Sequence, residues 1–482
     1  MNSRHVFKNI IKVSLSNIAK LASGVCIAFI LPKIVGITDY GFYKTFTLYA
    51  TYVSLFALGF VDGIYLAYGG IDYEKLDKRK LSFYSRLYLY FQLLFSVIGV
   101  LIASFIIQGE LRFIFLCVSV YLLANNITGY YQIVSQITGR FNELSLRNVI
   151  QSVSLSVSLL SIWGISRLLS INLSYRIFVI IYVFVGLILA AWYLFTYREI
   201  TFSKTDSSEC RISDFFGFVK LGLPLMVANL CSTLILSLDR QFVNIFFDTN
   251  TYAIYAFAYN MLSLITTAMA AISTVLYPMM KKSSLDHLQS RYSRFIEFIL
   301  VLSFGCVSVF FLLWGFVDWF LPKYSESIKI FRIIIPGIAI SSSITIVMHN
   351  YYKTIGKNFE FFIKCVVVLF ISICANLIAF FLFKTTESIS IASIIVMLFW
   401  YFLMDEYFVR TFKADTLKNT IYLFIMITSF YSTIYISSFA VGLFVYLLSY
   451  CAITLSLFGK DISNAVKKYL IKSNRLSKTK SI

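Results

Sequence analysis

The sequence is poor in the residue types from which most enzyme active sites are built. Only 23 of its 482 residues are acidic and only 3 are histidine. His5, His287 and His349 stand alone, without the spaced partners that a metal site needs, and the eight cysteines form no C-x-x-C pair. The chain also lacks the D-x-D of nucleotide-sugar sites and the G-x-x-x-x-G-K-[ST] phosphate loop. These absences argue against a metal or other cofactor, glycosyl transfer and direct ATP hydrolysis.

Apolar residues, by contrast, are abundant. They make up 59% of the chain, only 13% of the residues are charged, and the mean hydropathy is +0.81. This composition is typical of a protein whose solvent is the lipid bilayer. The net charge of +19 is spread over short loops between apolar runs, whereas a nucleic-acid partner would require it on one soluble face.

Fourteen apolar runs are long enough to cross a bilayer as helices. Lys and Arg are about four times as abundant in the loops on one side as on the other, which places both termini in the cytoplasm. We expect no cleavable signal peptide, because Lys20 interrupts the first run and no small-x-small site precedes Pro32. The predicted spans are 9–31, 43–69, 83–107, 113–137, 148–164, 177–197, 216–247, 252–278, 295–319, 331–352, 361–383, 389–409, 420–437 and 439–459.

The loops between these spans are short, and the longest inner one is 198–214. A membrane glycosyltransferase or a sugar polymerase needs an extramembrane platform for its chemistry, and this chain has little room for one. We therefore expect that the protein is not an enzyme.

A weak internal repeat divides the spans into two sets of six. Each set begins with a long span, a short outer hairpin, a Tyr-x-x-Tyr and a second span, as transporter repeats do. This predicts a first lobe at 1–205, a second lobe at 206–410 and an appended helix pair with a basic cytoplasmic tail at 411–482. The residues that match at an offset of 212 are Lys8 with Lys220, Asn17 with Asn229, Tyr40 with Tyr252, and Tyr43 with Tyr255.

Several charged residues fall inside the predicted spans, where an ionisable side chain is costly and often functional. Lys44 and Asp405, with others near span ends, are expected to reach the headgroups. Lys20 lies about 16 Å from the inner boundary, too deep for that, and Asn17 lies one turn earlier on the same face. Cavity lining and an ion pair with a carboxylate such as Asp62 are both open for Lys20. The candidate substrate-binding residues are Lys20, Asn17, Arg240, Lys220, Asn229 and Arg86, and the candidate coupling residues are Asp62 and Asp239.

Asp239 and Arg240 are neighbours, so their side chains point about 100° apart on a helix. In one arrangement Arg240 faces the cavity and Asp239 bonds a neighbouring helix. In the other, both pair structurally across the interface between the lobes.

Two stretches of the sequence resemble Wzx-type polysaccharide flippases, in the superfamily of multidrug/oligosaccharidyl-lipid/polysaccharide exporters. In the first lobe the likeness lies in PKIVGITDYGFYKTF at 32–46 and LGFVDG at 58–63. In the second lobe it lies in G-x-P at 222–224, the pair Asp239 and Arg240, and Y-x-x-Y-x-x-A-Y at 252–259. The resemblance implies an all-helical, MATE-like bundle of about fourteen spans in the bacterial inner membrane, with two lobes around a central cavity.

The resemblance also implies a function, which is to carry an undecaprenyl-pyrophosphate-linked oligosaccharide, an O-antigen or capsule repeat unit, to the outer leaflet by alternating access. Its partners would be membrane lipids, a polysaccharide polymerase, a chain-length regulator and a proton or sodium counter-ion. A lipid II flippase, a close relative of this function, stays open, and so do two functions of other kinds. A multidrug or small-cation antiporter on the same fold would want a carboxylate-rich cavity, and a polytopic polymerase would need a catalytic loop.

Overall fold

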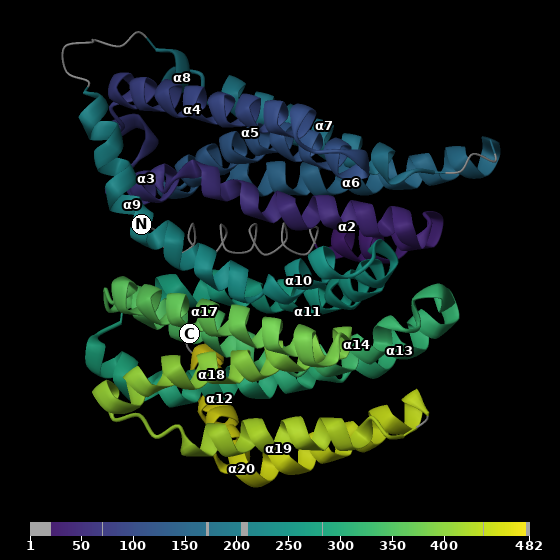
Figure 1. The fold of residues 1–482 in the computed structure, drawn as a ribbon. Helices are drawn as coiled ribbons and strands as arrows, with labels where there is room; N and C mark the ends of the chain where they lie inside the picture. Colours follow the sequence, from purple (N-terminus) through teal and green to yellow (C-terminus); the bar gives the residue numbers. More distant parts are fainter. Residues whose placement is uncertain are drawn as a thin grey trace. The chain divides into compact units, whose positions relative to one another are not determined.

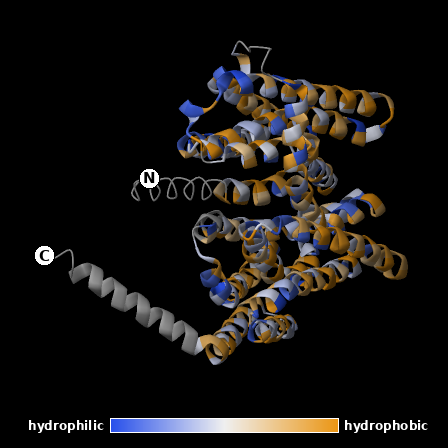
Figure 2. Ribbon diagram, turned by 90° about the vertical axis from the view of Figure 1, so that its left-hand side faces the viewer, coloured by the Kyte–Doolittle hydropathy of each residue, from blue (hydrophilic) through white to orange (hydrophobic). Residues whose placement is uncertain are grey.

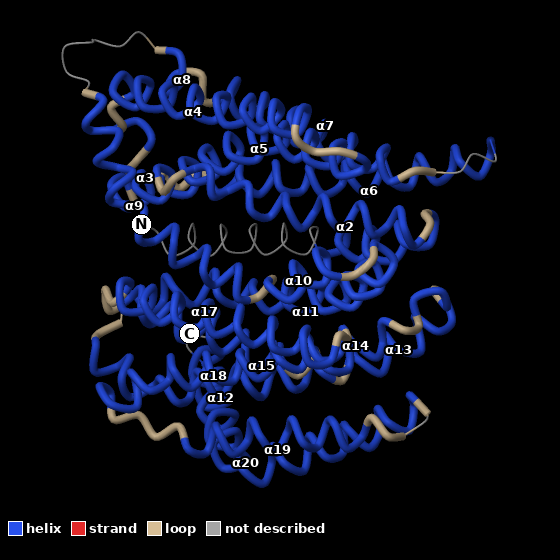
Figure 3. The backbone as a smooth tube through the Cα atoms, in the orientation of Figure 1, coloured by secondary structure: helices blue, strands red, loops and turns tan. Residues whose placement is uncertain are grey.

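The computed structural model describes residues 21–69, 71–169, 173–203, 211–281, 283–436 and 438–478, with side chains left out at 271, 274–275, 277–279 and 460–478. Within these ranges the chain is helical throughout, with turns between the helices and no strand (Figure 3). This confirms the all-helical fold class.

The helices follow one another with short connections (Figure 1). The first described helix is Leu21–Ile34. The others are α2 (Ile37–Tyr52), η1 (Val53–Ala57), α3 (Phe60–Tyr68), η2 (Tyr73–Lys75), α4 (Lys78–Phe105), α5 (Gly109–Ile137), α6 (Phe141–Leu169), α7 (Tyr175–Thr196), α8 (Glu199–Phe202), α9 (Ile212–Ile235), α10 (Leu238–Phe246), α11 (Thr249–Lys281), α12 (Leu285–Val307), α13 (Val309–Phe320), η3 (Pro322–Tyr324), α14 (Ser327–Ile334), α15 (Gly337–Ser342), η4 (Ser343–Met348), α16 (His349–Thr354), α17 (Asn358–Phe383), α18 (Thr386–Phe412), α19 (Leu417–Thr433) and α20 (Phe439–Lys478).

Ten helices in the described ranges are long and apolar enough to cross a membrane, and two bent pairs raise the number to as many as twelve. The pairs are Ile37–Ala57 with Phe60–Tyr68, bent by 58°, and Ser327–Ile334 with Gly337–Thr354, bent by 45°. The two remaining predicted spans correspond to the shorter helices Leu21–Ile34 and α19. Helices therefore lie where the apolar runs predict them, and the count of fourteen spans stays a prediction.

The bends have identifiable causes in the sequence. Leu58 and Gly59 both have positive φ, at 52° and 79°, which ends η1 before α3 begins. Pro336 precedes α15 and cannot donate a backbone hydrogen bond to the turn before it. Pro224 lies inside α9. In Figure 2 hydrophobic residues cover the helix shafts, while hydrophilic residues gather at helix ends and connections, as expected for a multi-pass membrane protein.

Packing contacts group the chain into two compact units. The first runs up to Val275 and includes Gly356–Val396, and the second comprises Leu276–Ile355 together with the chain from Met397 on. The first unit has an aromatic core, in which Phe60 stacks on Tyr88 and Phe215 with ring centroids 5.0 and 4.6 Å apart. The predicted lobe boundaries at 205 and 410 follow the order of the spans along the chain, whereas the two units follow packing contacts. The lobe boundaries therefore stay predictions.

Candidate functional site

The break between α9 and α10 places Asp239 and Arg240 in the first turn of α10. Asp239 is only 2% exposed. Its carboxylate accepts hydrogen bonds from the hydroxyl of Tyr255 at 2.9 Å, from the hydroxyl of Tyr259, and from the backbone N–H of Arg240 at 2.7 Å. Both tyrosines lie on α11, one turn apart. Asp239 therefore ties α10 to the neighbouring α11, as one of the two predicted arrangements has it.

Arg240 keeps an unused hydrogen-bond donor. Its Nη2 donates to the carbonyl of Leu236 at 3.2 Å, and its guanidinium carbon lies 4.9 Å from the ring centroid of Tyr259. Its Nε is buried and has no hydrogen-bond partner among the described residues. A buried guanidinium N–H without an acceptor is costly, so an acceptor bound at this position would relieve that cost.

Lys44, on α2, is the second cation at this place. Its Nζ donates to Oδ1 of Asn260 at 2.9 Å and lies 5.3 Å from the ring centroid of Tyr40. Lys44 and Arg240 are close enough to repel each other electrostatically. Within the described ranges neither forms an ion pair with a carboxylate. The expectation that Lys44 reaches the headgroups is wrong, because its ammonium group is held by an amide of α11.

A row of polar contacts fixes α10 against α2 around these cations. Gln241 donates to the hydroxyl of Tyr49 at 2.9 Å, and Asn244 donates to the hydroxyl of Thr45 at 2.7 Å. Near the break, the hydroxyls of Tyr52 and Ser237 lie 2.9 Å apart. The cations therefore lie in a polar seam between helices and not on an all-apolar face.

The turn between α10 and α11 is held by Asp248. Its carboxylate accepts from the hydroxyl and the N–H of Thr251 and from the N–H of Asn250, at 2.5, 3.1 and 2.9 Å. These hydrogen bonds stabilise the ionised form and lower the pKa of Asp248. The turn fixes where α11 begins, and with it the register of Tyr255 and Tyr259 against Asp239.

The other predicted binding residues lie elsewhere. Lys220 is exposed on α9, 15 positions before that helix ends at Ile235, which corresponds to about 22 Å of helix, and Arg240 lies beyond the break on α10. Arg86 is half-buried on α4, where its Nε donates to the carbonyl of Ser82 at 3.3 Å. Asn229, on α9, is also half-buried. The structure thus does not gather these three residues around Arg240. Lys20 and Asn17 lie outside the described residues.

Asp62 lies on α3 where that helix crosses α9 at very short range. A Cβ atom on Gly222 would come within 2.0 Å of the carbonyl oxygen of Gly59 and 2.2 Å of the N–H nitrogen of Gly63. A Cβ on Gly63 would in turn meet the carbonyl oxygen of Phe218 at 2.0 Å. The two glycine-containing motifs that carry the sequence resemblance therefore touch each other, and each needs glycine because backbone meets backbone.

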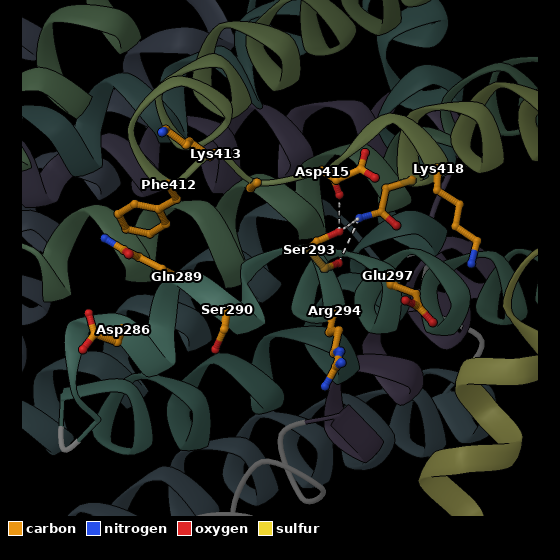
Figure 4. A pocket seen from close by; sticks show the side chains of 12 residues that line it. Asp286, Gln289, Ser290, Ser293, Arg294, Glu297, Phe412, Lys413, Asp415 and Lys418 are labelled. Carbon is orange, nitrogen blue, oxygen red and sulfur yellow. Dashed lines mark hydrogen bonds between the residues drawn. The ribbon is translucent and has the colours of Figure 1, made fainter.

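A pocket of about 510 Å³ lies in the second unit, and none of the predicted binding or coupling residues is among those that line it (Figure 4). Its floor is fixed by Ser293, whose hydroxyl donates to the carbonyl of Asp415 at 2.6 Å, and by Asn419, whose amide donates to the carbonyl of Ser293 at 2.9 Å. The charged residues that line it are Asp286, Arg294, Glu297, Lys413, Asp415 and Lys418. Equal numbers of acids and bases make it a poor site for a multiply charged anion.

Sequence reasoning missed two members of the candidate site, Lys44 and Asn260. Lys44 lies within PKIVGITDYGFYKTF, one of the stretches that carry the sequence resemblance. Because it lies close to the end of a predicted span, the sequence predicts that it contacts the headgroups. Asn260 directly follows the tyrosine motif at 252–259 and is the first polar side chain of α11 after it. An amide inside a predicted span was the signal that could have found it.

Comparison with known proteins agrees with this fold. The family model described as polysaccharide biosynthesis protein matches residues 6–284. Among solved structures, the lipid II flippase MurJ in an inward closed conformation matches with a TM-score of 0.69 and 16% identity, over 95% of this chain and 100% of that one. An inward-facing multidrug resistance MATE family transporter of the MOP superfamily matches with a TM-score of 0.60 and 14% identity, over 83% of this chain and 96% of that one.

A MOP superfamily transporter from Pyrococcus furiosus matches with a TM-score of 0.53 and 12% identity, over 85% of this chain and 97% of that one. A search of curated proteins by sequence found no match. At these identities the structural matches establish the fold alone. The family match covers more than half of the chain, and the chain therefore belongs to the polysaccharide biosynthesis protein family and has the fold of MOP superfamily transporters.

Proposed function

We propose that this protein is a flippase that moves an undecaprenyl-pyrophosphate-linked oligosaccharide, an O-antigen or capsule repeat unit, from the inner to the outer leaflet. The observation that carries the proposal is the pair Lys44 and Arg240. Two cations that repel each other lie on α2 and α10 of the first unit, with no carboxylate in an ion pair with either in the described ranges. The family match and the fold support the same class of function.

An anionic headgroup is the ligand that this arrangement fits. A single charge at the centre of a span costs at least about 2.5 kcal/mol on insertion scales, so two unpaired cations are retained only where something offsets the cost. A pyrophosphate bears about two negative charges, and a guanidinium matches phosphate oxygens in geometry as well as charge. The buried Nε of Arg240 is an available donor for it.

The nearby acid, Asp239, attracts Arg240 electrostatically but forms no ion pair with Arg240 or Lys44. The carboxylate of Asp239 accepts hydrogen bonds from two tyrosine hydroxyls and a backbone N–H. A small-cation antiporter would instead need free carboxylates facing its cargo. The net charge of the candidate site therefore favours an anionic substrate over the antiporter, although the fold is shared with MATE transporters.

The energy for export can come from the membrane potential. Outward movement of a negative headgroup is downhill in an inside-negative cell by about 2.3 kcal/mol per charge per 100 mV, which fits the absence of a phosphate loop for ATP. We propose an inner-membrane location with both termini cytoplasmic, lobes at 1–205 and 206–410, and a polymerase and chain-length regulator as downstream partners. Lys20 and Asn17 are proposed to extend the binding surface, and Asp62 to take part in coupling.

The test is complementation of a deletion strain, with the leaflet that holds the lipid-linked oligosaccharide measured in spheroplasts. We expect deletion to leave completed repeat units on the cytoplasmic face and to abolish the surface polymer. Lys44→Ala and Arg240→Ala should fail to restore export while reaching the membrane at normal levels. Lys220→Ala is the matched control, since it removes one positive charge from an exposed position on α9, and it should restore export.

Each alternative has its own result. Repeat units that reach the outer face unpolymerised in the deletion strain would make the protein a polymerase. An unchanged surface polymer together with increased sensitivity to cationic drugs would make it an antiporter. Full export by both cation variants would remove Lys44 and Arg240 from the site.

A further inference from the structure

A second buried acid, Asp405, lies in the other unit of the chain. It is 4% exposed and lies on α18, about two turns before the end of the helix at Phe412. The sequence predicts that it reaches the headgroups, and its burial shows that this expectation is wrong. Unlike Asp239, it has no arginine beside it in the sequence and no ion pair in the described ranges.

The groups that hold Asp405 are hydroxyls. Tyr292, on α12, donates to Oδ1 at 2.7 Å, and Thr416, in the connection between α18 and α19, donates to Oδ2 at 2.7 Å. The carboxyl group therefore joins three parts of the second unit. No cation supplies the compensation that a buried carboxylate usually needs.

Tyr401 adds a second, independent observation. It lies four residues before Asp405 on α18, so the two side chains share one face of the helix, and the two groups interact electrostatically. The hydroxyl of Tyr401 is fully buried and has no hydrogen-bond partner in the described part of the chain. A hydroxyl oxygen beside a carboxyl group is an acceptor for the proton of the neutral acid.

The charged pocket of the second unit is lined by residues next in sequence to members of this cluster. Ser293 and Asp415, which fix its floor, are the sequence neighbours of Tyr292 and Thr416. Phe412 lines the pocket (Figure 4). Its ring also contacts that of Tyr292, with centroids 6.4 Å apart. A space of about 510 Å³ lined by charged groups is large and polar enough for water, so a proton donor can reach Ser293 and Asp415, which are next in sequence to the two residues that bind Asp405.

We propose that Asp405 is a proton-binding site loaded from this pocket, and that its charge sets how firmly α12 is tied to the connection between α18 and α19. Hydrogen bonds to a carboxylate are about twice as strong as those to a neutral acid. A proton taken from pocket water neutralises Asp405 and weakens its bonds from Tyr292 and Thr416, while the new O–H donates to Tyr401. Loss of the proton to water restores the stronger hydrogen bonds from Tyr292 and Thr416 to Asp405.

The other titratable groups around the cluster divide by the element that carries them. From α16, Tyr352 faces it and donates to the carbonyl of Met404 at 3.2 Å. The charged groups that line the pocket are Asp286, Arg294 and Glu297 on α12, Lys413 and Asp415 in the connection after α18, and Lys418 on α19; Arg291 is a further charged residue of α12. The six residues that line the pocket comprise equal numbers of acids and bases. Asp405 is then the buried charge that a proton can remove.

Infrared difference spectroscopy of the full-length protein in lipid nanodiscs, between acid and alkaline buffer, tests the site without any substrate. We expect a C=O band from a protonated carboxyl group in apolar surroundings, which grows as the pH falls and is lost in Asp405→Asn. Asp286→Asn is the matched control, because it makes the same chemical change at an exposed position on the pocket and should keep the band.

Tyr401→Phe keeps the test decisive if Asp405→Asn does not fold. It removes one oxygen atom and the acceptor for the protonated form, so the band should persist with its midpoint moved to lower pH. A band unchanged in Asp405→Asn, an unmoved midpoint in Tyr401→Phe, or no titrating carboxyl band in the native protein would each overturn the proposal. Because no substrate is present, these outcomes are independent of whether the cargo is a lipid-linked oligosaccharide.

Discussion

Substitution of Gly222 by alanine tests the closest helix crossing in the protein. The added Cβ would lie 2.0 Å from the carbonyl oxygen of Gly59 and 2.2 Å from the backbone nitrogen of Gly63. Both are backbone atoms, so no side chain can rotate away, and α3 and α9 must separate. Overpacking of a well-packed core costs about 1–3 kcal/mol, and we expect the upper end here. At about 1.4 kcal/mol per factor of ten, that is roughly a hundredfold change in the folding equilibrium.

The assay is thermal unfolding of purified protein in detergent, with Gly217→Ala as control on the same helix. A Cβ on Gly217 meets nothing within 4 Å, and alanine in a helix is favoured over glycine by about 0.5–1 kcal/mol. We expect the apparent melting temperature to fall by several degrees for Gly222→Ala and to stay or rise for Gly217→Ala. Equal melting temperatures for both variants would refute the backbone crossing.

Three further substitutions test other contacts, each by thermal unfolding. Tyr259→Phe removes one hydrogen bond from buried Asp239, which we expect to cost about 1–3 kcal/mol; an unchanged stability would show that the hydroxyl does not bind Asp239. Asp248→Asn should destabilise the protein at neutral pH. The folded pKa of Asp248 lies below its unfolded value of about 3.9, so its contribution to the free energy of unfolding is present above that value and is lost as the pH falls through the folded pKa. If Asp248→Asn remained less stable than the native protein at the lowest pH, the loss of stability would not come from the charge of Asp248. Lys413 has φ of +51° after the end of α18, so Lys413→Gly should be neutral or stabilising, by up to about 1 kcal/mol, and a clear loss of stability would show that its side chain holds the connection.

The position of each helix along the chain could be predicted because length and apolarity control it. The break at Leu58 and Gly59 was not predicted, because 43–69 is one apolar run and the positive φ values appear only in the structure. The turn at Asp248 has a local signal in the sequence, a short polar stretch between two apolar runs. The motifs at 58–63 and 222–224 were likewise visible as motifs. The sequence does not predict that these two motifs pack on each other, because the contact joins residues more than 150 positions apart.

The sequence by itself determined that this is a multi-pass helical membrane protein, where its helices lie, and that Asp239 and Arg240 face different ways. Only the tertiary structure decided that Lys44 joins Arg240, that Lys220 and Arg86 lie apart from it, and that Asp405 is buried among hydroxyls. The reason is physical: lipid-facing and protein-facing sides of a membrane helix are both apolar, so hydropathy gives the depth of a charged residue and not the direction in which it points. That direction is set by the neighbouring helices, here α11 for Lys44 and α12 for Asp405.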